Sequence, residues 1–318
     1  MEVYRTINGH VAKYVHDDGS ETAIKTIPEG EVGCGGYGNV GNKYNIFIST
    51  SVGCPVGCKF CYLTTKKCPY HKLSVNDIVM NVLDAINAEL LVRPELRSMY
   101  TKLSWMGMGD GFLDTKLVFE VTEELLYYIQ SFELSAGIDG VDIATTLPKI
   151  PSTTINYIDK LSELVWETHL NPKREYIRGF NRQPFRIFYS LHSADNDTRS
   201  LLIPNTEDVL EAINYFKTLE IKGITVILHH MFFEDINDSF DEANHLISLL
   251  SVFNNIELRL LRFNACPGTT YKESSNFDAL VAHINKQHTN IKVQLSPGSE
   301  ISAACGQFLL SRIVKNEV

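Results

Sequence analysis

The chain of 318 residues has a formal net charge of −9, and 44% of its residues are hydrophobic, which is typical of a globular protein with a sizeable core. No apolar run approaches the ~20 residues that a membrane span requires, and Met1–Arg5 lacks the apolar segment of a signal peptide. The acidic balance argues mildly against a large phosphate-binding surface. Seven cysteines, several of them clustered in one loop, favour a reducing compartment, so we expect a cytoplasmic protein with no membrane partner.

The first 42 residues predict a small region of β-structure. His10–His16 and Glu21–Ile27 have strand-like composition, and the turn residues between them favour a hairpin. Several glycines then surround Cys34, which indicates a flexible connection. We expect residues 1–42 to form a region of their own before a larger domain over residues 43–318.

From residue 43 onward, strand-like segments alternate with segments whose apolar residues recur at helical spacing. The predicted strands are Tyr44–Thr50, Leu103–Met108, Val141–Thr145, Phe185–His192, Ile224–Met231, Ile256–Phe263 and Ile291–Leu295. The predicted helices are Val75–Leu91, Leu117–Ser131, Thr153–Leu164, Val209–Leu219, Phe240–Leu250 and Phe277–Lys286. Ser74, with Asp77 three residues later, predicts the N-cap of the first helix.

This alternation predicts an α/β fold with a parallel sheet. The chain has about six strand–helix units, too few for a closed barrel of eight, so we expect a partial (β/α)6 barrel. In such folds the chemistry lies at the carboxyl ends of the strands.

Three cysteines follow the first of these strands at C-x₃-C-x₂-C spacing, namely Cys54, Cys58 and Cys61. So short a loop can wrap three thiolates around one metal centre, and its glycines allow the backbone to turn sharply. Three thiolates on a four-iron cluster leave one iron open to a cofactor such as S-adenosylmethionine (SAM). The alternative is a structural zinc site with Cys68 as the fourth ligand.

The second strand ends in the run Trp105–Asp110, which contains two glycines and a carboxylate. Glycines allow a ligand to approach the backbone closely, and the Asp110 carboxylate suits a positively charged amino group. A Gly-x-Gly sequence alone is often only a tight turn. Placed one strand after a cluster loop, it is the expected clamp for the aminoacyl end of SAM.

Two later strands also end in polar residues. Ser190–His192 closes the fourth strand, where a lone histidine is more often a structural hydrogen-bonding residue than a ligand. Asn264 closes the sixth strand, where reading an adenine or ribose edge and forming a turn are equally good interpretations. His229 and His230 point to opposite faces of one strand, so together they do not form a metal site.

Residues 166–184 interrupt the alternation of strands and helices with basic residues among aromatic ones. The basic residues are Lys173, Arg174, Arg178 and Arg182, and the aromatic residues among them are Tyr176 and Phe180. Such interleaving can bind a phosphate backbone and stack on bases. On an acidic protein, a solvated surface segment is the commoner interpretation of such a stretch.

The last motif is Ala303–Gln307, in which small residues flank Cys305. Small neighbours leave the sulfur accessible at the mouth of the predicted barrel. A free cysteine is more often a buried small hydrophobic residue, and the local sequence alone favours that interpretation.

In this order, the motifs resemble those of the radical SAM rRNA/tRNA adenine-methylase family over roughly residues 10–310. The cysteine loop marks the superfamily in general. The combination of Met-Gly-Met-Gly-acid, Ser-Leu-His, Asn-x-x-Pro-Gly and Ala-Ala-Cys-Gly-Gln is specific to the family.

The resemblance implies a role for each matching position. Cys54, Cys58 and Cys61 would hold a [4Fe–4S] cluster, and Cys305 would itself be methylated. The residues implied to contact SAM are Gly109, Asp110, Ser190, Leu191, His192 and Asn264, with Thr145 beside the position of a family serine.

The implied activity is a methyl transfer in two stages. One SAM molecule methylates Cys305, and a second is cleaved reductively to a 5′-deoxyadenosyl radical that activates the new methyl group. The resulting carbon radical adds to an adenine carbon in RNA or in a smaller nucleotide-like substrate. A reductant such as flavodoxin or ferredoxin would supply the electron.

The chain also departs from the family pattern. The family's second cysteine corresponds to Phe47, and a family glutamate corresponds to about Ala23. Asp110 stands for the clamp glutamate, and Ala144 for the serine. Gln294–Pro297 replaces basic residues, and the resemblance leads us to expect that the accessory N-terminal domain is largely missing.

Without the family's second thiol, another group must resolve an adduct on Cys305. Cys34 is the first candidate, because its glycine-rich segment can fold over the barrel mouth. Cys266 is the alternative, and a third possibility is that no disulfide forms.

Two other functions stay open from the sequence. In one, the radical chemistry is kept and Cys305 acts as a hydrogen donor. In the other, the chain is a binding protein stabilised by zinc or by a cluster.

Overall fold

The computed structural model describes residues 1–26, 43–149, 157–169, 183–254, 256–294, 297–304 and 306–307. Its strands are β1 (Glu2–Arg5), β2 (Val11–Val15), β3 (Glu21–Thr26), β4 (Lys43–Phe47), β5 (Ser51–Val52), β6 (His71–Lys72), β7 (Tyr100–Trp105), β8 (Gly137–Thr145), β9 (Phe185–Ser190), β10 (Thr225–His230), β11 (Glu257–Leu261) and β12 (Ile291–Gln294). Its α-helices are α1 (Tyr62–Thr65), α2 (Val75–Val92), α3 (Thr115–Ser131), α4 (Tyr157–His169), α5 (Asn196–Leu202), α6 (Val209–Ile221), α7 (Phe240–Leu250) and α8 (Phe277–Asn285).

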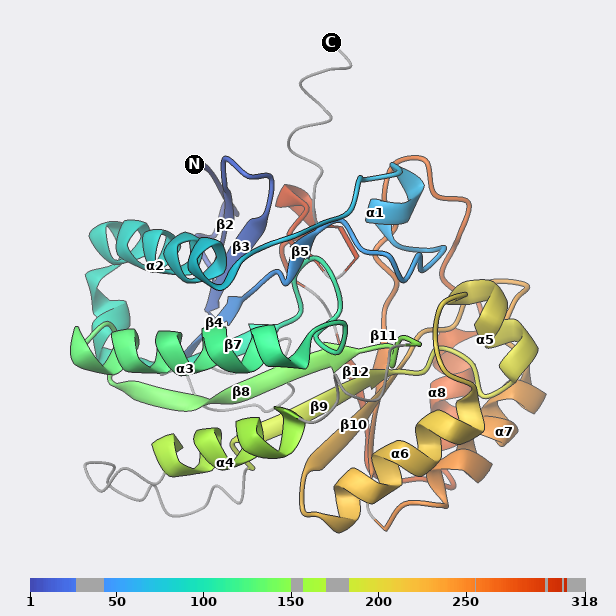
Figure 1. Cartoon of the computed structure of the whole chain (residues 1–318). Helices are drawn as coiled ribbons and strands as arrows, with labels where there is room; N and C mark the ends of the chain where they lie inside the picture. Colours follow the sequence, from blue (N-terminus) through green and yellow to red (C-terminus); the bar gives the residue numbers. More distant parts are fainter. Residues whose placement is uncertain are drawn as a thin grey trace.

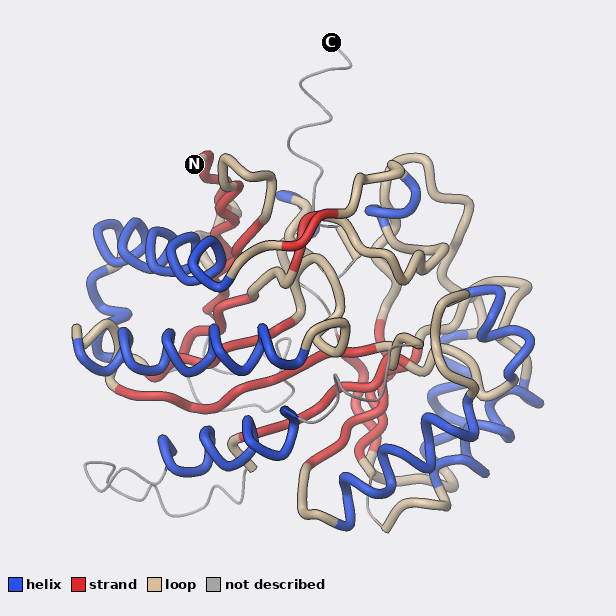
Figure 2. Tube along the Cα trace, in the orientation of Figure 1, coloured by secondary structure: helices blue, strands red, loops and turns tan. Residues whose placement is uncertain are grey.

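One curved sheet of ten strands organises the molecule, in the order β1-β2-β3-β4-β7-β8-β9-β10-β11-β12 (Figure 1). From β4 to β12 neighbouring strands are parallel, and β1 to β3 extend the sheet from β4 in antiparallel fashion. Most of the helices lie on the outer side of this curved sheet (Figure 2). The expectation of a partial barrel is therefore confirmed.

The two faces of the sheet differ in chemistry. Residues such as Leu103 and Ile187 join the apolar core with the helices. On the alternate positions, Lys102, Asp142 and Arg186 are buried in ion pairs inside the curve of the sheet, with 2.6 Å between Arg186 Nη2 and Asp142 Oδ2 and 3.4 Å between Lys102 Nζ and Asp142 Oδ2. The barrel interior is thus polar, and the carboxyl ends of its strands open onto this interior.

The predicted helix boundaries agree well with the structure at α2 and α7. Helix α7 has the predicted bounds, and α2 begins with the predicted cap, because the Ser74 side chain accepts from the N–H of Asp77. The short elements β1, α1 and α5 were not predicted, since each is too short to show a period. The glycine-rich connection around Cys34 lies outside the described residues, and the boundary at residue 42 stays a prediction.

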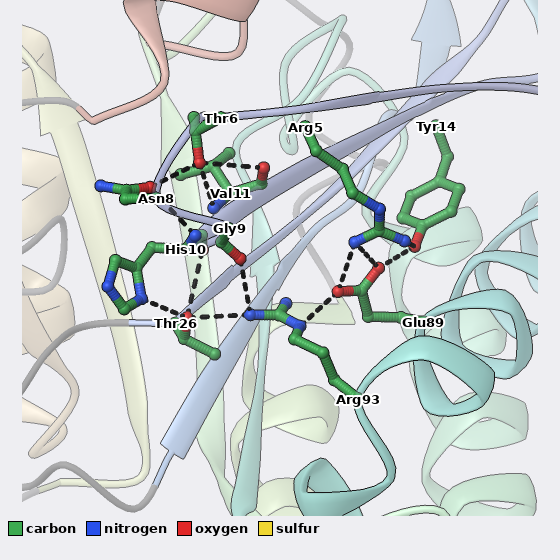
Figure 3. Close-up of polar contacts among 10 residues, drawn as sticks. All are labelled: Arg5, Thr6, Asn8, Gly9, His10, Val11, Tyr14, Thr26, Glu89 and Arg93. Atoms are coloured by element: carbon green, nitrogen blue, oxygen red, sulfur yellow. Dashed lines mark hydrogen bonds and ion pairs between the residues drawn. The ribbon is translucent and has the colours of Figure 1, made fainter.

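A buried carboxylate joins the N-terminal strands to α2 (Figure 3). Glu89 is fully buried and accepts hydrogen bonds from Arg5 at 2.8 Å and from Tyr14 and Arg93. Arg93 also donates to the carbonyl oxygen of Gly9 at 2.9 Å. These contacts hold β1 and β2 against α2.

Candidate active site

The cysteine loop lies between β5 and α1, and the path of its backbone requires glycine. Gly53 and Gly57 have φ angles of +67° and +75°, in the left-handed region that favours glycine. A Cβ atom on Gly53 would also lie 2.6 Å from the carbonyl oxygen of Pro69. Cys61 ends the loop as the N-cap residue of α1.

Contacts from distant parts of the chain fix this loop in place. The Asn205 side chain donates to the carbonyl oxygens of Pro55 and Val56 at 3.2 and 3.1 Å. Val56 is buried in a small apolar cluster with Leu202 and Phe233. The loop is therefore held by the end of α5 and the residues that follow it, as well as by its own turns.

The three thiols suit a metal cluster by their chemistry. Burial raises the pKa of Cys54 to about 12 and the pKa of Cys61 to about 11, and burial together with the neighbouring thiols raises the pKa of Cys58. Thiolates at these positions need a cationic partner, which iron would provide. Within the described segments, no group of three or more histidine, cysteine or carboxylate side chains is arranged to hold a single metal ion.

A cavity of about 190 Å³ opens beside the loop, at the carboxyl ends of the parallel strands. Cys58 and Cys61 line it. So do six of the residues predicted to contact SAM, namely Gly109, Asp110, Thr145, Ser190, His192 and Asn264. Leu191 and Cys54 are not among its lining residues, and the Leu191 side chain packs into the main core.

Asp110 is buried, with three hydrogen bonds to its carboxylate. Oδ2 accepts from the N–H and the hydroxyl of Thr146 at 2.7 and 2.9 Å, and Oδ1 accepts from the N–H of Phe112 at 2.9 Å. Burial raises the pKa of Asp110, although these hydrogen bonds oppose the shift. Asp110 thus ties the end of β7 to the residue after β8, in addition to facing the cavity.

The glycines before Asp110 allow two strand ends to approach each other closely. A Cβ atom on Gly107 would lie 2.6 Å from the Ser49 hydroxyl and 2.7 Å from the Ile48 carbonyl oxygen. At Gly109, where φ is +91°, it would lie 2.1 Å from the Thr50 hydroxyl. Packing against the segment after β4 is therefore a sufficient reason for both glycines.

A buried arginine that was not predicted as a site residue holds the end of β9 by hydrogen bonds. Arg199 donates to the carbonyl oxygens of Ser190 at 2.9 Å and Thr146 at 2.7 Å. His192 has a φ of +56°, and its Nδ1 accepts from the N–H of Met231 at 3.1 Å. Burial lowers the pKa of His192 well below its ordinary value, so the imidazole is neutral.

An aromatic residue inside the cysteine motif connects the loop to the strand ends. The ring of Phe60 lies 5.2 Å from that of His192, edge to face, and 5.1 Å from that of Phe233. The ring of Phe60 therefore forms part of the cavity wall between the cysteines and the fourth strand of the barrel.

Two buried lysines hold the segment that precedes Cys305 in the sequence. Lys25 on β3 donates to the carbonyl oxygens of Ala303 at 2.7 Å and Pro297 at 3.1 Å. Lys13 on β2 donates to that of Ser302 at 3.2 Å. The N-terminal strands therefore support the C-terminal segment at the barrel mouth.

The departures from the family pattern at two positions lie side by side. Ala23 on β3 and Phe47 on β4 are register partners in the sheet. The Lys25 ammonium lies 4.4 Å from the centre of the Phe47 ring. The two positions at which the resemblance predicts departures from the family thus form one apolar pair beside a lysine ammonium.

Some of the predicted residues lie outside the described parts of the chain. They are Cys34, Cys305, Lys173, Arg174, Arg178 and Arg182. Cys266 is buried. The pKa of Cys61 is raised mainly by burial, and Cys266 is close enough to add to this shift. The cavity also has lining residues that were not predicted as ligands, His229 and Gln294 among them. Strand alternation alone could have placed both on the inner face.

Comparison with known proteins agrees with this site. Residues 48–247 match the model of the radical SAM superfamily. The chain is 29% identical over 286 residues to the dual-specificity RNA methyltransferase RlmN of Wolinella succinogenes, covering 87% of this chain and 69% of that protein. It is 25% identical over 311 residues to a probable RlmN of Prochlorococcus marinus, covering 95% and 80%.

A solved structure shares the fold. The chain superposes on a radical SAM methyltransferase from Sphaerobacter thermophilus with a TM-score of 0.68 and 21% identity, covering 96% of this chain and 80% of that one. None of the described helices is long and apolar enough to cross a membrane. The resemblance seen in the motifs is confirmed, and the chain belongs to the radical SAM superfamily, whose enzymes use a [4Fe–4S] cluster and SAM.

Proposed function

We propose that the protein is a radical SAM methyltransferase that modifies an adenine-type carbon in RNA or in a smaller nucleotide-like substrate. One observation carries the proposal: a single cavity is lined by two cysteines of the cluster motif, by five residues at the family's SAM positions, and by Thr145 beside a sixth. The names of the relatives, which are RNA methyltransferases, support RNA as the substrate class. The cysteine usage supports a cytoplasmic location.

In this proposal Cys54, Cys58 and Cys61 hold the cluster. When bound, the cluster supplies an electron for the cleavage of SAM, and flavodoxin or ferredoxin is the proposed reductant. Asp110 accepts from the SAM amino group with the lone pairs that Thr146 and Phe112 leave unused. The apolar walls of the cavity exclude water from the reacting groups.

Cys305 is proposed to carry the methyl group, and Cys34 to resolve the adduct. A second candidate function, in which Cys305 donates a hydrogen atom, is favoured by one observation. Ala23 and Phe47 occupy the paired positions where the family has a glutamate and a thiol, and neither side chain can act as a base or form a disulfide.

The test is the mass of the tryptic peptide that contains Cys305, after anaerobic incubation with SAM labelled in its methyl group. A labelled methyl group on Cys305 in the wild type, absent in Cys305→Ala, is the expected result. An unmodified Cys305 in a protein that still cleaves SAM would favour the hydrogen-donor function.

The cysteine assignment predicts the iron content. Replacing Cys54, Cys58 or Cys61 by alanine should abolish the brown colour and the bound iron, because an iron would lose its thiolate ligand. Cys68→Ala is the matched control and should keep both. If the protein instead contained zinc and Cys68→Ala lost it, the cysteines would form a structural zinc site and not a cluster site.

A further inference from the structure

His229 is a buried histidine in the cavity for which neither the sequence motifs nor the family positions give a role. It lies on β10, is 6% exposed and lines the cavity. Its Nε2 atom is buried and has no hydrogen-bond partner among the residues that the structure describes. Buried polar atoms are nearly always paired, so an unpaired one in a cavity wall calls for an explanation.

The charged neighbour of His229 on β11 is engaged elsewhere. Ser190 on β9 and Arg259 on β11 are its register partners, and the ring of Phe188 lies 4.9 Å away. The Arg259 guanidinium donates to Glu257 and, at 3.1 Å, to Gln294. The protein thus supports the imidazole on both sides without hydrogen bonding its Nε2.

The imidazole is neutral in this environment. Burial lowers the pKa of His229 to about 3, and the nearby Arg259 and Arg186 add to the effect against the opposing influence of Glu257 and Asp142. A neutral imidazole has one nitrogen that donates and one that accepts. The unpaired Nε2 can therefore donate or accept one hydrogen bond, according to the tautomer.

The adjacent His230 provides an internal comparison. Both of its ring nitrogens are buried and unpaired in the described part of the chain, and its ring lies 4.5 Å from that of Phe232. His230 is not among the residues that line the cavity. An unpaired nitrogen alone therefore does not indicate a ligand, and the cavity is what distinguishes His229.

We propose that His229 binds an adenosine moiety in the cavity through a hydrogen bond from its imidazole. The apolar cavity walls, which include Trp105, Met231 and Leu261, suit a flat purine, and a few polar groups would fix its orientation. The amino group and ring nitrogens of adenine offer the donor and acceptors that a neutral imidazole complements. The adenosine belongs either to SAM or to the adenine substrate, and the SAM case rests on the proposed function.

The test compares ligand affinities in the cluster-loaded protein under anaerobic conditions. S-adenosylhomocysteine, which is not cleaved, probes the SAM source, and a short oligoadenylate probes the substrate source. His229→Leu should weaken one of the two by about tenfold, and His229→Gln, which can donate and accept, should recover most of the loss. His230→Leu is the matched control and should leave both affinities unchanged.

The outcomes separate this inference from the proposed function. A loss confined to S-adenosylhomocysteine assigns His229 to SAM, and a loss confined to oligoadenylate assigns it to the substrate. Wild-type affinity for both in a folded His229→Leu protein overturns the inference. If His229→Leu does not fold, His229→Met takes its place with the same criteria. A wild type that does not bind S-adenosylhomocysteine contradicts SAM binding itself, and the oligoadenylate measurement still tests His229.

Discussion

Asp110 shows how one side chain serves both the fold and the site. Its carboxylate accepts two hydrogen bonds from Thr146 and one from Phe112, so it fixes the loop after β7 against the end of β8. The same residue faces the cavity. The sequence indicated the second function from the charge and the position at a strand end, and it contained no signal for the first.

Asp110→Asn is therefore expected to affect stability as well as binding. The amide nitrogen would face either the N–H of Phe112 or the two donors of Thr146, so at least one hydrogen bond becomes a repulsive contact. We expect the free energy of unfolding to fall by about 1–3 kcal/mol, and SAM affinity to fall as well because the charge is lost. Urea denaturation and calorimetric titration with SAM measure the two effects.

Asp114→Asn is the control for this prediction. Asp114 caps α3, where it accepts from the N–H of Leu117 at 3.1 Å, and it does not line the cavity. Asparagine caps helices as well as aspartate does, so this variant should retain both stability and SAM affinity. Unchanged values in Asp110→Asn would contradict the role of Asp110.

At the scale of elements, the N-terminal strands support two other parts of the molecule. Glu89 fastens β1 and β2 to α2 through Arg5, Tyr14 and Arg93 (Figure 3). Lysines on β2 and β3 hold the segment before Cys305. The β-structure expected at the start of the chain thus joins α2 to the segment at the barrel mouth.

Glu89→Ala should weaken the attachment of β1 and β2 to α2 and so lower the free energy of unfolding. It leaves the buried phenol of Tyr14 and the two arginines without their shared acceptor, and removing one partner of a buried ion pair costs about 3–5 kcal/mol. Because Arg5 and Arg93 are partly exposed, we expect the lower end of that range. The measurement is urea denaturation.

Glu120→Ala is the matched control, because Glu120 pairs with Lys116 on the exposed face of α3. Surface pairs of this kind contribute about 0.3–0.5 kcal/mol. Equal losses of stability in the two variants would show that Glu89 does not join the strands to the helix.

At the scale of the whole molecule, the periodic pattern predicted the order of the strands and helices, and with it the site. Parallel strands bring their carboxyl ends to one edge, so Asp110, His192 and Asn264 could be placed together from the sequence. The charged interior could not be predicted, because a residue such as Lys102 within a strand usually indicates solvent exposure. Contacts such as that between Lys25 and Ala303 join residues far apart in the sequence, and no local sequence pattern indicates them.

Buried neutral histidines predict how stability depends on pH. Burial lowers the pKa of His16 to about 4 and the pKa values of His229 and His230 to about 3. An unfolded histidine binds a proton near pH 6.5, so between about pH 6.5 and pH 4 the unfolded chain binds more protons than the folded one. The free energy of unfolding should therefore fall on acidification, by up to about 1.4 kcal/mol per pH unit for each such histidine.

Urea denaturation at a series of pH values across this range measures the slope. His230→Leu removes one of these histidines from a position outside the cavity, so its slope should be smaller by about one proton. Parallel slopes for the wild type and the variant would show that His230 is not kept neutral by the fold.

The hydrogen bond between Lys25 and Ala303 joins residues 278 positions apart, and this separation has a consequence for biosynthesis. Contacts between such distant residues form late in folding, because the entropy of closing a long loop must be overcome first. During translation the thiols at positions 54 to 61 leave the ribosome long before Ala303 exists. The contacts between β3 and the C-terminal segment can therefore form only after the cysteine loop has been synthesised, so the mouth of the barrel is the last part of the sheet's surroundings to be completed.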